Sequence, residues 1–112
     1  MKMAIKNIPF AVTDWTAVPA EEHRGESGTS AWKTVEHAGL RVRMIEYAPG
    51  FRSDHWCARG HVVLVLEGEI EAALRDGRRF VLRPGTSFVA GDDESNPHLV
   101  SSGPGAKVFV VD

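Results

Sequence analysis

The chain has 112 residues, of which 43% are hydrophobic and 25% charged, and its formal net charge is -2 at pH 7. This length and composition predict one globular domain with its own core, and the absence of a basic stripe excludes nucleic acid as an expected partner. The one cysteine excludes an internal disulfide, and no apolar run is long enough for a signal peptide or a bilayer span, so we expect a cytoplasmic protein with no membrane partner.

Residues 1–39 are predicted to form an N-terminal arm. Prolines and glycines interrupt its first thirty residues, and residues 21–28 are expected to form an exposed loop. Short strands are expected near Ile8–Val12 and Ala31–Glu36. Such an arm covers a sheet edge or exchanges with a partner subunit, so we expect it to pack on the barrel predicted below or on a second copy.

Residues 40–112 carry the pattern of successive strands. Leu40–Tyr47 alternates with a period of two and ends at Pro49-Gly50, and Val62–Leu66 is a continuous apolar run, which is typical of a strand buried on both faces. Turn signals recur roughly every eight to ten residues, which favours an all-β sandwich or barrel.

The pair Asp76-Gly77 is the strongest hairpin signal, and we expect a type I′ turn there because such a turn needs positive φ at both central residues. In the strand before this turn, every second side chain is expected to point inward. After the turn, Phe80 and Leu82 are expected to pair with that strand. The remaining strands are expected at Thr86–Ala90, His98–Ser101 and Ala106–Val111.

Three histidines and the one cysteine are placed where a small barrel can bring them together. His55 and Cys57 are two residues apart, so on a strand both side chains leave on the same face. Arg59-Gly60 can turn the chain and bring His61 opposite this pair, while His98 approaches from another strand. Imidazole nitrogen and thiolate sulfur are the usual zinc ligands, so we interpret His55, Cys57, His61 and His98 as candidate metal ligands.

Other interpretations of these residues remain open. Cys57 is equally well explained as a small buried hydrophobic residue, and His98 as a partner of the polar turn before it. If Cys57 points away, three imidazoles and an open coordination position remain, which is the arrangement of catalytic sites. His23 and His37 have no partner at ligand spacing and are left out of the site.

Two segments resemble the motifs of the cupin superfamily. Its first motif runs from a glycine through two histidines and a glutamate to a second glycine, and here the corresponding residues are Gly50, His55, Cys57, His61 and Gly68. The second motif is matched more loosely by Gly85-Thr86, Ala90-Gly91 and His98. The segment Asp54-His55-Trp56-Cys57 is also similar to that of small cupins named for a DHCW motif, although the last two residues stand in the order Trp-Cys.

The resemblance covers about two thirds of the chain and implies a single-domain double-stranded β-helix, or jelly-roll barrel, that forms a homodimer. The chain departs from the pattern at three positions: Cys57 replaces a histidine, His61 stands at the glutamate position, and Ala90 replaces a proline. The usual set of three histidines and a carboxylate becomes three histidines and a thiolate. Softer ligands favour zinc or nickel, with iron or copper as alternatives.

We therefore predict a metal-binding cupin with a cavity for a small molecule in the barrel, and assign no catalytic residue. If it is an enzyme, its chemistry is that of metal-dependent cupins: dioxygenase, isomerase or hydrolase-like. The alternative is a non-catalytic binding or sensor module in which the metal is structural or absent. Redox sensing through Cys57 is a further hypothesis, because a thiolate near imidazolium or a metal is readily oxidised.

Overall fold

The computed structural model describes residues 5–112 and builds them almost entirely from β-strands, with one short 3-10 turn at Trp15–Ala17. The strands are β1 (Glu21–Arg24), β2 (Thr29–His37), β3 (Leu40–Tyr47), β4 (Phe51–Arg52), β5 (His61–Gly68), β6 (Ile70–Leu74), β7 (Arg79–Leu82), β8 (Ser87–Ala90), β9 (His98–Ser102) and β10 (Ala106–Val111). Within the described residues, no helix has the length and apolar character that crossing a membrane requires.

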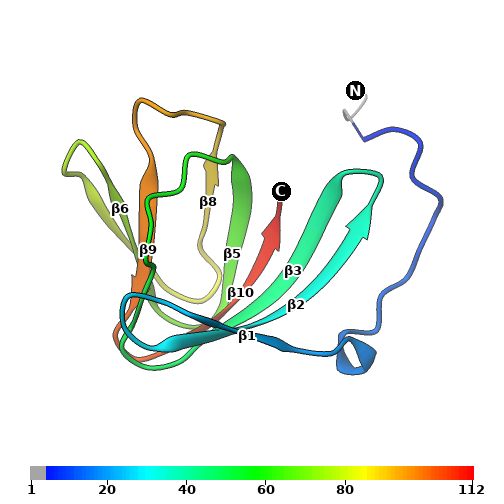
Figure 1. Cartoon of the computed structure of the whole chain (residues 1–112), viewed down its shortest axis with the longest axis horizontal. Helices are drawn as coiled ribbons and strands as arrows, with labels where there is room; N and C mark the ends of the chain where they lie inside the picture. The colour runs from blue at the N-terminus through cyan, green and yellow to red at the C-terminus, as the bar shows by residue number, and fades with distance from the viewer. Residues whose placement is uncertain (1–4) are drawn as a thin grey trace.

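The strands form two antiparallel sheets that face each other (Figure 1). The larger sheet has the order β1-β2-β3-β10-β5-β8, and the smaller one has the order β4-β9-β6-β7. Several neighbours in each sheet come from distant parts of the chain, as where β10 lies between β3 and β5 and β9 lies between β4 and β6. The prediction of an all-β double-stranded β-helix is confirmed.

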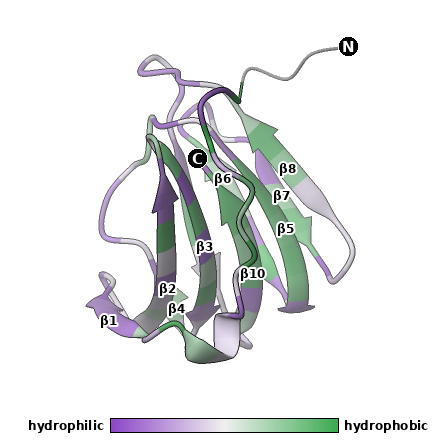
Figure 2. Cartoon of the chain, turned by 90° about the vertical axis from the view of Figure 1, so that its right-hand side faces the viewer, coloured by the Kyte–Doolittle hydropathy of each residue, from purple (hydrophilic) through white to green (hydrophobic). Residues whose placement is uncertain are grey.

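The core lies where the inner faces of the two sheets meet. β5 contributes Val63 and Val65, β10 contributes Val108 and Val110, and the smaller sheet contributes Ile70 and other residues of β6 and β7. Burying a valine or isoleucine side chain stabilises the fold by about 1.5–3 kcal/mol, so this cluster supplies much of the driving force for closing the sheets. Figure 2 shows the hydrophobic character concentrated along β5, β8 and β10.

The prediction that Val62–Leu66 is buried on both faces is wrong for the single chain. Val63 and Val65 are buried, but Val62 is 48% and Leu66 39% exposed. The run therefore obeys the two-residue period of a strand with one inner face, and its outer face remains apolar and accessible.

The type I′ turn occurs at a different hairpin from the predicted one. At Asp76-Gly77 only the glycine has a positive φ, of 100°, and the N–H of Leu74 donates to the carbonyl of Arg78 at 2.9 Å. This is a three-residue loop that needs one left-handed residue. Both central residues have positive φ instead at Ala38-Gly39, with 47° and 90°, in the two-residue loop between β2 and β3.

The N-terminal region is only partly as predicted. Residues 1–4 lie outside the described part, Ile8–Val12 forms no strand, and Ala31–Glu36 falls inside β2 as expected. The predicted exposed loop begins with strand β1, whose side chains are mostly exposed and which pairs only with β2 at the sheet edge. Packing of residues 1–39 as an arm on a partner stays a prediction.

Candidate metal centre

Cys57 is held in place by a reciprocal pair of backbone hydrogen bonds with His98. The N–H of Cys57 donates to the carbonyl of His98 at 2.7 Å, and the N–H of His98 donates back at 2.9 Å. This is the closely spaced pair of an antiparallel ladder. It fixes the connection between β4 and β5 against the first residue of β9, so two residues far apart in the sequence share one point in the fold.

His61 comes to the same point as the first residue of β5. Its Nε2 lies 2.7 Å from Nε2 of His98 and 3.7 Å from Sγ of Cys57. The ligand atoms of all three side chains lie within 4.8 Å of one another. The structure thus brings together three of the four residues that the sequence singled out.

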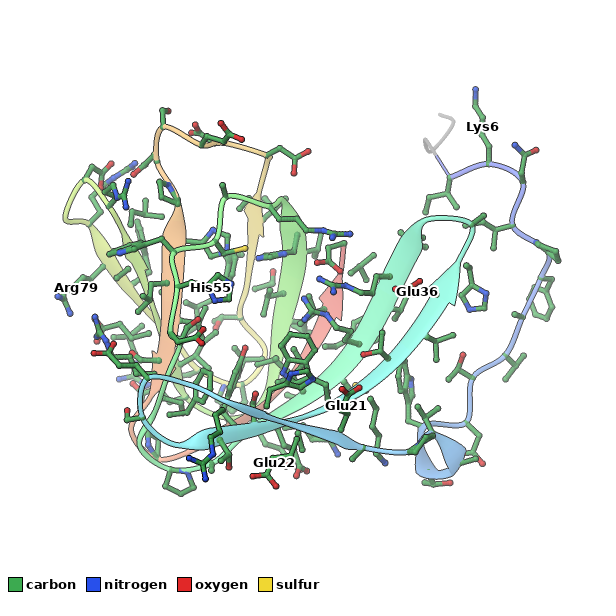
Figure 3. The ribbon with its side chains drawn as sticks, viewed as in Figure 1. Lys6, Glu21, Glu22, Glu36, His55 and Arg79 are labelled. Atoms are coloured by element: carbon green, nitrogen blue, oxygen red, sulfur yellow. The ribbon has the colours of Figure 1, made fainter. Side chains whose placement is uncertain are left out.

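His55 lies outside this group. Its side chain is 71% exposed, and its Nδ1 is 2.7 Å from Oδ1 of Asp54. Figure 3 shows it on the connection between β4 and β5. The expectation of an extended strand through His55 and Cys57 is wrong, because the single bridge at Cys57 is the only strand pairing in residues 53–60. A ligand role for His55 stays a prediction.

No sequence pattern indicated Asp112, whose side chain is fully buried beside His61. Its Oδ2 lies 3.3 Å from Nδ1 of His61. Backbone hydrogen bonds between Asp112 and Arg41 continue the β3–β10 ladder past Val111 and place this carboxylate on the inner face. Carboxylates commonly orient metal-bound imidazoles in this way, but no short motif marks a residue that acts from a strand end.

The environment keeps both histidines neutral. Burial and, to a smaller extent, the neighbouring His61 lower the pKa of His98 to about 4. Burial also lowers the pKa of His61, although the hydrogen bond with Asp112 opposes this. Neutral imidazole is the form that binds a metal, so neither histidine is in the charged form that would first have to lose a proton at neutral pH, whereas Cys57 ligates as its thiolate.

The Asp112 contact also determines which nitrogen of His61 is free. With the carboxylate accepting a hydrogen bond from Nδ1–H, the Nε2 of neutral His61 carries a lone pair and accepts the 2.7 Å hydrogen bond from Nε2–H of His98. For His98 to ligate through the same atom, its proton must move to Nδ1. Ligand nitrogens around zinc stand about 3.3 Å apart, from bonds of about 2.0–2.1 Å at a tetrahedral angle. The donor set therefore fits a first-row metal after a small separation of the two rings.

A cavity of about 150 Å³ adjoins these donors. Cys57, His61 and His98 line it, and so does His55, together with aromatic side chains and three arginines. Phe88 packs edge-on against His98, with ring centroids 5.6 Å apart. A metal held here would face a small, partly apolar space.

Comparisons with known proteins support the fold. No protein-family profile matches the sequence, and no curated protein matches it. Among solved structures, the polyketide cyclase RemF from Streptomyces resistomycificus superposes with a TM-score of 0.74 at 22% identity, over 92% of this chain and 78% of that one. Fe(II)-HppE with an alternative substrate gives 0.74 at 16% identity, over 92% and 60%. The EutQ protein of Clostridium difficile gives 0.63 at 17% identity, over 76% and 68%.

These structural neighbours are cupin-fold proteins, so this chain has the cupin fold. The chain spans 60% of the length of the HppE chain that it matches. At such identities the likeness establishes architecture alone, and it leaves the DHCW-type subfamily as a hypothesis. What the site does must follow from its own residues.

Proposed function

We propose that this chain binds one divalent first-row transition metal through Cys57, His61 and His98 and accommodates a small molecule beside it. The observation that carries the proposal is the convergence of one sulfur and two nitrogen ligand atoms within 4.8 Å. Neutral imidazoles and an orienting carboxylate at His61 support it further.

The donor atoms favour zinc or nickel. A thiolate with two imidazoles is a softer set than the carboxylate-containing sets that suit manganese, and Cys/His sites are frequent for zinc. Iron is the metal named for the neighbour Fe(II)-HppE, so iron and copper belong in the same loading experiment.

Three protein donors leave a coordination position for water or a ligand, which is the arrangement of catalytic rather than structural zinc sites. A metal bound there supplies Lewis acidity toward a carbonyl or activates water. The chain's own contribution is to hold His61 in one tautomer through Asp112 and to line the space beside the metal with Phe88 and the surrounding strands. On this basis an enzyme is favoured over a purely structural metal protein.

Metal content of the folded protein tests the proposal. We expect about one zinc or nickel per chain after loading and dialysis, with a large loss in Cys57→Ala and His98→Ala. The control is His37→Ala, which removes a histidine of β2 outside the ligand group and should leave stoichiometry unchanged. His55→Ala tests whether the fourth predicted residue contributes. Unchanged metal content in folded Cys57→Ala and His98→Ala would refute the proposed site.

A further inference from the structure

Three arginines converge on one carboxylate beside the ligand group. Alternate residues of β3 face inward, which places Arg41 and Arg43 along the cavity, and Arg59 reaches it from the connection before β5. On Oδ2 of Asp112, Nη2 of Arg41 lies at 2.8 Å, Nη2 of Arg43 at 3.2 Å and Nε of Arg59 at 3.3 Å. Nδ1 of His61 also approaches this oxygen.

Asp112 cannot satisfy all these donors. A carboxylate oxygen has two lone pairs, whereas four nitrogen atoms surround this one, and each guanidinium brings five N–H groups. One carboxylate therefore faces three guanidinium groups within 3.3 Å, and the site keeps a surplus of positive charge.

Of the three arginines, Arg43 gives the strongest evidence for an anion site. The residue is 6% exposed, and its guanidinium carbon lies 4.5 Å from the centroid of the Trp32 ring, on which it stacks. Its Nε is buried and has no hydrogen-bond partner among residues 5–112. Buried donors in native proteins almost always have an acceptor. Arg43 lines the cavity beside two further guanidinium groups, Arg41 and Arg59, and such a group is suited to bind a planar or tetrahedral anion.

We propose that this cavity binds a small organic acid, whose carboxylate or phosphonate group is held by Arg41, Arg43 and Arg59. The inference rests on the proposed function, which places the other end of this small molecule beside the metal. It adds the chemical class of the small molecule. The apolar part of the acid packs against aromatic residues of the cavity, Trp32, Tyr47, Phe51 and Phe88. Burial raises the pKa of Tyr47 to about 12, so this side chain adds no competing negative charge.

The cavity limits the size of the acid. Its volume is about 150 Å³. This suits a chain of a few carbon atoms and is well below the range for a drug-sized ligand. Butyrate and propylphosphonate are therefore suitable probes, and butyramide is the neutral counterpart of butyrate.

Calorimetric titration of metal-free and zinc-loaded protein with the three probes tests the inference. We expect at least one of the two acids to bind about tenfold or more tightly than butyramide in both forms, because the arginine charge is present without the metal. The preference between butyrate and propylphosphonate tells which anionic group fits. Equal affinity for the acids and the amide, or no binding of either acid to either form of the protein, would overturn the proposal that the cavity binds an organic acid.

Single substitutions test whether the arginines cause the preference for acids. Arg43→Gln should weaken the preferred acid by about tenfold or more, and Arg59→Gln, with a half-exposed side chain, by about threefold. The control is Arg79→Gln, since Arg79 pairs with Glu71 on the outside of the fold (Figure 3). If Arg43→Gln does not fold, the smaller loss of acid affinity in Arg59→Gln tests the role of the arginines. Acid binding unaffected by these variants would contradict the assignment.

Metal content measured in the same samples separates the two proposals. Metal bound with no preference for the acids overturns the ligand class alone. Acid binding that depends on Arg59, in protein that takes up no metal, overturns the metal centre alone.

Discussion

Asp112 reaches His61 from the strand next to it in the sheet, with Oδ2 at 3.3 Å from Nδ1, and leaves Nε2 of that ring directed at the other donors. The same carboxylate joins Arg41 through two hydrogen bonds of 2.8 and 3.0 Å. One buried side chain therefore links the orientation of a candidate ligand to the charge of the adjacent cavity. Its removal should affect both metal affinity and stability.

For Asp112→Asn we expect metal affinity to fall by about 10–100-fold, the usual effect of losing a carboxylate that orients a ligating histidine. We also expect a loss of about 3–5 kcal/mol in the free energy of unfolding, because the buried guanidinium of Arg43 loses its counter-charge. Competitive metal titration and urea unfolding measure the two effects. Wild-type metal affinity in the folded variant would show that Asp112 does not position His61.

The stability of the metal-free protein should depend on pH through His98. Burial lowers its pKa from 6.5 to about 4, so between these values the unfolded chain takes up a proton that the folded chain refuses. The free energy of unfolding should therefore fall as the pH drops from about 6.5 to about 4, by at most about 3 kcal/mol, and this residue should contribute no slope above that window. His61 acts in the same direction.

Urea unfolding at several pH values, with the metal removed, measures this slope. His98→Gln should flatten the profile between pH 4 and 6.5, since it removes the titrating group and keeps a polar side chain. A profile in the folded variant as steep as that of the wild type would assign the pH dependence to other groups.

Gly60→Ala should disturb the metal centre through the backbone. Gly60 lies between two candidate ligands, and its N–H donates to Oδ1 of Asp92 at 2.7 Å. An added Cβ would stand 2.8 Å from the carbonyl oxygen of Ala90 and 3.0 Å from the backbone nitrogen of Asp92, so the connection must shift. We expect metal affinity to fall by about tenfold, in line with the sensitivity of such sites to small displacements.

Gly91→Ala is the matched control for this substitution. A Cβ at Gly91 meets nothing within 4 Å, so metal affinity should stay at the wild-type value. Equal metal affinities for the two variants would mean that the connection before β5 tolerates movement.

We also propose that the protein forms a homodimer through the apolar outer face of β5 and β8. Val62, Leu66 and Val89 are 48%, 39% and 79% exposed on these strands. Exposed apolar side chains of this kind, close together on one face, are typical of an interface between subunits. Val89→Lys should convert the dimer to monomer in size-exclusion chromatography with light scattering. A wild-type protein that is already monomeric would contradict the proposal.

Sequence patterns were sufficient for much of the fold. Ala106–Val111 matches the predicted strand residue for residue, and Phe80 and Leu82 pair with β6 as expected. The hairpin type was wrong because Asp-Gly also suits a three-residue loop in which only the glycine is left-handed. Strand β1 was missed because its charged residues, glycine neighbours and edge position resemble those of a loop.

The candidate site was predicted less completely. Cys57, His61 and His98 meet because spacing and topology bring strand ends together, but His55 lies outside the group because no strand carries it. Arg41 and Arg43 gave no signal, since a period of two does not say which face is inside and arginine usually lies outside. Their inward position follows from β3 lying between β2 and β10 and contributing Ile45 to the core.

X-ray absorption at the metal edge of the zinc- or nickel-loaded protein reports whether Cys57, His61 and His98 hold the metal together. We expect one sulfur at about 2.3 Å and two imidazole nitrogens at about 2.0–2.1 Å, and loss of the sulfur shell in Cys57→Ser. A first shell of oxygen and nitrogen without sulfur in the wild-type protein would contradict it.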